Sequence, residues 1–142
     1  AFQRGVNAVD PSLVELYLPW PGYEAAAVRP GNVVHLPIGQ AYATARRFHP
    51  AWHKCSPAVR SLHARNAQII LGARLASSAG LVVCWTPGGR ETGGTGLGIR
   101  LARAYGLPVY NLTDEKAEPD LRRFGISAGH VAAKGKQMCF DF

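Results

Sequence analysis

The stretch LVVCWTPGGRETGGTGLGIRLARAYGLPVYNL, residues 81–112, decides the fold. It begins with a short apolar run, Leu81–Trp85, of the kind found in a buried parallel strand. Glycines follow, and then an amphipathic helical pattern that reaches Tyr105 and is ended by Gly106. A second apolar run, Leu107–Leu112, predicts another buried strand. Strand, glycine-rich loop, helix and strand in this order indicate a parallel β-α-β unit.

The rest of the chain repeats this alternation of strands and helices. We expect two β-type runs, Ser12–Trp20 and Asn32–Ile38, followed by a helix over Gln40–Phe48. A second helix is expected to begin with Ser56 as its cap and Pro57 at its first position, and a short last helix is expected over Glu118–Ile126. The length of 142 residues suits one domain. The sequence therefore predicts a single Rossmann-like α/β domain over residues 1–142, a doubly wound and mainly parallel sheet with helices on both faces. Residues 113–142 are expected to form a C-terminal helix and a polar tail.

Positive charge is concentrated in one part of the chain. The sequence has 16 Lys and Arg against 9 Asp and Glu, a net charge of +7, and the segment from Arg46 to Arg74 contains no carboxylate. Such a segment attracts polyanions, although it can also be an ordinary solvated face. We expect contacts with nucleic acid from four of its residues: Arg46, Arg47, Lys54 and Arg60. With no membrane-spanning run and no signal peptide, the sequence favours a cytoplasmic protein that has no membrane partner.

The glycine-rich loop predicts a site for phosphate. Beyond the carboxyl end of a parallel strand, glycines let the backbone approach an anion, and the free amides at the start of the next helix favour negative charge. The predicted ligands are the amides of Gly93, Gly94, Thr95 and Gly96, with hydroxyls from Thr95 and Thr86. Trp85, at the strand end, is predicted to stack on a base. The alternative is a loop in which glycines serve only for turns, because the motif has no Gly-Lys-Ser/Thr and is not a P-loop.

Two polar residues of the helix that begins at Pro57 extend this hypothesis. Asn66 falls in the middle of the apolar stripe of that helix, so its amide needs a buried partner. It either contacts a ligand or ties down a neighbouring loop. Arg65 points off the stripe and can reach toward the strand ends, where it would pair with an anion.

The order of these motifs resembles a known family. LHARNAQIIL (residues 62–71), LVVCWTPGG and TGGTGLGIRLARAYGLPVYNL together look like the DprA-like branch of the SMF/DprA-LOG (SLOG) superfamily, and YLPWPG and FHPAW are similar to segments of small phage-encoded DprA-like proteins. The resemblance implies a Rossmann-like fold and a pocket for nucleic-acid phosphates. At the matching positions that pocket would be lined by Arg65, Asn66 and residues 92–96. It also implies a domain that can form a homodimer, in a bacterial or phage-infected cell.

The chain departs from the family pattern in two places. Members usually carry a strand and a glycine motif before the segment that matches AFQRG, residues 1–5, so we expect the domain to be N-terminally incomplete. An absent strand would leave an open apolar sheet edge. The hydrolases of the LOG branch carry a glutamate just after the glycine loop, where this chain has Ile99 and Arg100. Glu91 lies before the loop and is a poor substitute as general acid or base.

Three functions remain open from the sequence. The first is binding of nucleotides or single-stranded nucleic acid without catalysis. The second is a LOG-like nucleotide phosphoribohydrolase or N-glycosidase, and the third is a sensor or antagonist that captures a small nucleotide signal. No cofactor is expected. The spacing of His49, His53, Cys55 and His63 fits no known ligand set, so we also expect no metal, and the thiols of Cys55, Cys84 and Cys139 are expected to be buried or idle.

Overall fold

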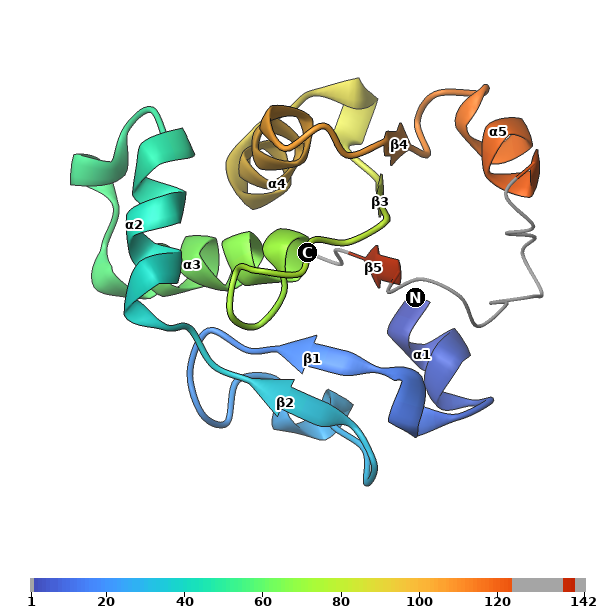
Figure 1. The fold of residues 1–142 in the computed structure, drawn as a ribbon, viewed down its shortest axis with the longest axis horizontal. Helices are drawn as coiled ribbons and strands as arrows, with labels where there is room; N and C mark the ends of the chain where they lie inside the picture. Colours follow the sequence, from blue (N-terminus) through green and yellow to red (C-terminus); the bar gives the residue numbers. More distant parts are fainter. Residues whose placement is uncertain (1, 124–136, 140–142) are drawn as a thin grey trace.

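The computed structural model describes residues 2–123 and 137–139, and its strands form two parallel sheets (Figure 1). β1 (Glu15–Tyr17) pairs with β2 (Val33–His35). The second sheet has the order β4-β3-β5, with β3 (Leu81–Cys84) between β4 (Val109–Asn111) and β5 (Gln137–Cys139). The α/β class and the parallel pairing are thus confirmed. Because the described strands form two sheets rather than one, the doubly wound arrangement stays a prediction.

Four of the described helices lie close to the segments where the sequence predicts them, and a fifth, at residues 2–7, is one that the sequence analysis did not predict. They are α1 (Phe2–Asn7), α2 (Gly39–Phe48), α3 (Pro57–Leu71), α4 (Gly93–Ala104) and α5 (Ala117–Arg123), with short 3-10 turns η1 (Pro11–Leu13), η2 (Ala25–Ala27), η3 (Trp52–Lys54) and η4 (Pro87–Gly89). The hydroxyl of Ser56 accepts a hydrogen bond from the Val59 amide at 3.4 Å, so the expected cap of α3 is present. Gly106, at a φ of +70°, follows the end of α4.

Helix α3 is the centre of the packing. It contacts α2, α4 and β1, and Figure 1 shows it between α4 on one side and β1 on the other. Ile70 of α3 is fully buried in the main core together with Leu97 and Leu101 of α4. Burying each of these side chains contributes about 1.5–3 kcal/mol. The apolar stripes of α3 and α4 therefore fix the position of the α4 start.

Three expectations need correction. Gly93, Gly94 and Gly96, which were predicted to lie in a loop, belong to the first turn of helix α4, where the amides need no intrahelical partner and glycine is tolerated. The strand predicted over Ser12–Trp20 is shorter, because Asp10 caps η1 with its carboxylate accepting from the Ser12 amide at 2.9 Å. The expected polar tail contains β5, which pairs with β3. The edge of β3 that faces away from β4 is therefore covered.

Candidate functional site

The start of α4 presents amides that are free to bind an anion. Gly93, Gly94 and Thr95 are the first three residues of α4, and no acceptor for their amides lies among the residues that the structure describes. The Gly96 amide begins the helical pattern by donating to the Thr92 carbonyl at 3.0 Å. The side chain of Thr92 does not cap the helix. We call residues 92–96 the glycine turn. Its three open amides and the positive end of the helix dipole favour a negatively charged group.

Two glycines of the glycine turn are required by the backbone. Gly93 has a φ of +62°, a conformation that other residues adopt at a cost. A Cβ atom at Gly96 would overlap the carbonyl oxygen of Glu91. The chain before α4 thus folds tightly against the helix start, which only glycine at position 96 allows.

Asn66 ties the glycine turn to α3. Its side chain is fully buried, and its Nδ2 donates to the Gly94 carbonyl at 3.2 Å. Its Oδ1 is also buried and has no hydrogen-bond partner among the described residues. The hydrogen bond to Gly94 fits the alternative in which Asn66 ties down a neighbouring segment, and contact of Asn66 with a ligand stays a prediction.

Arg65 lies toward a different segment. It is partly buried, and burial lowers the pKa of its guanidinium, while the nearby Tyr23 and Glu24 act in the opposite direction. Tyr23 and Glu24 follow β1 in the chain. The structure thus brings Asn66 to the glycine turn and places Arg65 near the segment after β1, so a shared grip of both residues on one phosphate stays a prediction.

The two remaining residues predicted at the strand end differ in accessibility. Trp85 follows β3 and is 58% exposed, so its indole ring is available for stacking. Thr86 is buried, and its hydroxyl oxygen accepts a hydrogen bond from Nδ2 of Asn111 at 2.6 Å. Thr86 therefore joins the ends of β3 and β4. Asn111 is a partner that the sequence analysis missed, because nothing in its local pattern distinguishes it from a surface residue of a strand end.

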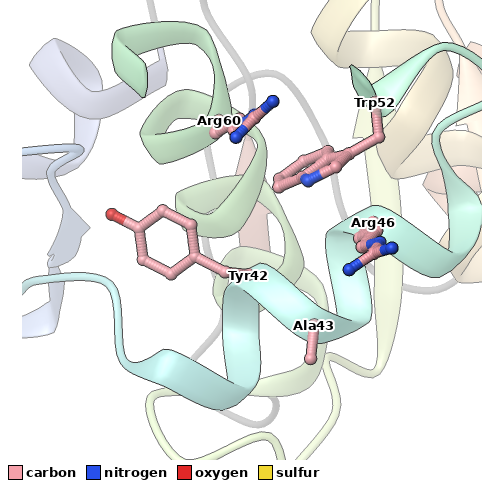
Figure 2. Close-up of a pocket in the computed structure, with 5 residues that line it drawn as sticks. All are labelled: Tyr42, Ala43, Arg46, Trp52 and Arg60. Atoms are coloured by element: carbon pink, nitrogen blue, oxygen red, sulfur yellow. The ribbon is translucent and has the colours of Figure 1, made fainter. Parts of the chain in front are cut away.

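A second surface lies in the basic segment. A hollow of about 340 Å³ is lined by residues of α2, η3 and α3, which we call the arginine hollow: Tyr42, Ala43, Arg46, Trp52 and Arg60. The guanidinium carbon of Arg60 lies 5.7 Å from the centre of the Trp52 ring, a cation–π contact. Figure 2 shows the indole between Arg60 and Arg46 in this view. Of the four residues predicted to contact nucleic acid, Arg46 and Arg60 line this hollow. Arg47 and Lys54 are exposed and do not line it.

The hollow is also lined by three residues to which the sequence analysis gave no binding role: Tyr42, Ala43 and Trp52. Trp52 also packs against the core from the short turn η3. Tyr42 shares a hydrogen bond of 2.9 Å with the hydroxyl of Ser61. The only available signal was the helical spacing of Tyr42 and Arg46, which puts both on one face of α2.

The carboxylate nearest to the glycine turn in sequence is already engaged. Glu91 accepts two hydrogen bonds from Arg103 of α4, at 2.6 and 2.7 Å, as a bidentate ion pair. Ile99 and Arg100 stand where the resemblance to the LOG hydrolases would lead us to expect glutamate. Arg100 donates a hydrogen bond from Nε to the Phe48 carbonyl at 3.3 Å. Both side chains therefore have structural partners: Glu91 pairs with Arg103 in the last turn of α4, and Arg100 bonds to the carbonyl at the end of α2.

Residues that could hold a metal converge elsewhere. His49, Cys55 and His63 place one ligand atom each within 4.8 Å of one another, whereas His53 lies outside this group. The sequence did not predict this cluster because the three residues are separated along the chain. They come together only when the turn between α2 and α3 folds against α3.

Comparison of the chain with protein-family models, with curated proteins and with solved structures finds no match. Among the described residues, no helix combines the length and the apolar composition needed to cross a bilayer.

Proposed function

We propose that the chain is a DprA-like protein with a Rossmann-like, doubly wound domain that binds single-stranded nucleic acid or nucleotides. The observation that carries this proposal is the arginine hollow, in which Arg60 makes a cation–π contact with Trp52, and Arg46 lines the same hollow. Guanidinium planes and aromatic rings are the groups on which proteins stack unpaired bases, and the charge of arginine attracts phosphate. Three residues that line the hollow, Arg46, Trp52 and Arg60, belong to the stretch from Arg46 to Arg74, which has no carboxylate to repel a polyanion.

The glycine turn supplies the second part of the proposal. Three amides at the start of α4 have no acceptor among the described residues. The exposed Trp85 directly follows β3, the strand that precedes α4 in the chain. A phosphate at these amides and a base on Trp85 would use the backbone and one side chain without reading a sequence. Because the hollow and the turn belong to different helices, a strand of several nucleotides suits them better than a single nucleotide.

Catalysis is the less favoured function. Hydrolysis of a glycosidic bond needs a group that gives or takes a proton near the bound nucleotide. Glu91, the carboxylate before the glycine turn, is held by Arg103 in a bidentate pair. We therefore propose binding, and treat release of free base as a result that would replace this proposal.

Fluorescence anisotropy with a labelled oligothymidylate tests the proposal. Single strands lose about 0.7 logarithmic units of affinity per phosphate contact for each tenfold rise in salt, so three contacts predict a slope of about −2. The Arg46→Ala, Arg60→Ala double variant should bind several-fold more weakly and with a shallower slope. Arg74→Ala, an exposed arginine of the same segment outside the hollow, is the matched control.

Three outcomes of this experiment would count against the proposal or redirect it. Absence of binding, or binding that is indifferent to salt, contradicts it. A mononucleotide that survives purification and is seen by mass spectrometry, together with no affinity for the oligonucleotide, would replace the polymer by a captured nucleotide. Free base released from nucleoside monophosphates, detected by chromatography, would establish the hydrolase.

A further inference from the structure

Three side chains that bind transition metals meet where α2 is joined to α3. His49 follows α2, Cys55 precedes the Ser56 cap, and His63 belongs to α3. Sγ of Cys55 lies 3.8 Å from Nδ1 and 3.9 Å from Nε2 of His49, and the two imidazole centres are 4.4 Å apart. Ligand atoms on a tetrahedral zinc ion are about 3.3–3.6 Å apart, given bonds of about 2.3 Å to sulfur and about 2.0–2.1 Å to nitrogen. Small side-chain rotations would therefore close this geometry.

His63 lacks a partner that its burial requires. Only 5% of the residue is exposed, and Nδ1 has no hydrogen-bond partner among the described residues. A buried polar atom of this kind usually has a partner or an ion. Burial, followed by the neighbouring His49, Arg100 and Arg65, lowers the pKa of His63 to about 4. The unpartnered Nδ1 offers a metal ion one ligand atom.

The other two ligands are oriented by the turn that contains them. The Ala51 amide donates to Nδ1 of His49 at 3.2 Å, which places the lone pair of the neutral ring on Nδ1. Cys55 directs its Sγ toward the Ala51 carbonyl at 3.7 Å. A metal on Nδ1 would replace this long amide contact with His49, and the rest of the turn already holds both side chains near the required positions.

Charge and ligand type select the ion. The guanidinium of Arg100 acts electrostatically on both histidines and that of Arg65 acts on His63, so positive charge opposes a cation there. A Cys55 thiolate, formed when the metal displaces its proton, offsets that charge. Thiolate and imidazole together favour zinc over magnesium or calcium, which prefer oxygen ligands.

We propose that His49, Cys55 and His63 form a three-ligand zinc site with the fourth position left to water or to a small ligand. The site would close the turn between α2 and α3. Trp52 lies within that turn, and its ring centre is 6.2 Å from that of His49 and 6.3 Å from that of His63. Zinc would therefore also fix the tryptophan of the arginine hollow, although the site itself does not depend on nucleic-acid binding.

Cobalt substitution tests the site directly. The protein is treated with a chelator, exchanged into metal-free buffer and titrated with Co²⁺. We expect one Co²⁺ per chain, with a sulfur-to-cobalt charge-transfer band and the intense visible bands of a tetrahedral ion, and zinc should displace both. Cys55→Ser should abolish the charge-transfer band, and His63→Gln should weaken binding at least tenfold. His53→Ala, an exposed histidine of the same turn, should bind like the unchanged protein.

A second measurement needs no variant. Alkylation followed by peptide mass spectrometry compares the reactivity of Cys55 with and without one equivalent of zinc, and zinc should protect Cys55 several-fold. The proposal is overturned if Co²⁺ gives no tetrahedral spectrum, if the charge-transfer band survives in Cys55→Ser, or if zinc leaves the alkylation of Cys55 unchanged. Circular dichroism of each variant shows whether a lost band reflects the missing ligand or an unfolded chain. If a variant is unfolded, the alkylation of Cys55 in the unmodified sequence decides whether the zinc site exists.

Discussion

The glycine turn and the arginine hollow are built in opposite ways. The glycine turn is made of backbone atoms, and tight contacts hold it in place: Gly96 against Glu91, and Asn66 against Gly94. The arginine hollow is made of side chains from three separate elements that surround open space. A change in the turn should therefore be felt mainly as lost stability. A substitution in the hollow should mainly lower the affinity for oligonucleotide.

Gly96→Ala should have the largest effect. The added Cβ would overlap the Glu91 carbonyl oxygen, so either the backbone before α4 or the helix itself must move. We expect a loss of about 3 kcal/mol in the free energy of unfolding, measured by urea denaturation.

Gly39→Ala is the control for that variant. A Cβ at Gly39, the first residue of α2, meets nothing within 4 Å. Its stability should be unchanged or up to about 1 kcal/mol higher. Equal stabilities for the two variants would show that the glycine turn is not held by this close approach.

Asn66→Ala should be the next in size. The change removes the hydrogen bond to the Gly94 carbonyl and leaves a small cavity at a fully buried position. We expect about 2 kcal/mol of destabilisation in the same urea assay. Gln40→Ala, an exposed polar residue of α2, should change stability by less than about 0.5 kcal/mol. Full stability of Asn66→Ala together with weaker binding of oligonucleotide would assign Asn66 to the ligand instead of to the turn.

Arg60→Ala should show the reverse pattern. Its guanidinium makes a cation–π contact with Trp52 in the lining of the hollow. Its loss should weaken oligonucleotide binding by about 1 kcal/mol, or about fivefold, and flatten the salt slope by the share of about one phosphate contact. Arg60→Lys keeps the charge but not the planar group, so it should restore the slope and only part of the affinity. An unfolding midpoint that falls as far as in Asn66→Ala would break the division between the two regions.

The sequence could predict the features that depend on local patterns, but not those that depend on contacts between distant residues. Leu81–Cys84, α4 and β4 follow from local apolar patterns, and Ser56 followed by Pro57 marks the start of α3 without any tertiary information. The glycine turn is likewise a local motif. β5 could not be found, because Gln137–Cys139 becomes a strand only by pairing with the distant β3. His49, Cys55 and His63 meet for a similar reason, since their spacing matches no metal motif until the turn folds back on α3.

Glu91→Gln should have the smallest effect on stability. The Glu91–Arg103 pair is partly exposed, with 34% and 59% of the two side chains accessible, so its loss should cost only about 0.5 kcal/mol and less at high salt. Freed from its carboxylate, Arg103 would add an unpaired positive charge to α4, the helix that the glycine turn begins. Oligonucleotide binding at low salt should therefore tighten slightly while stability falls. Weaker binding in Glu91→Gln would mean that the carboxylate itself contacts the ligand, and it would return Glu91 to consideration as an acid or base.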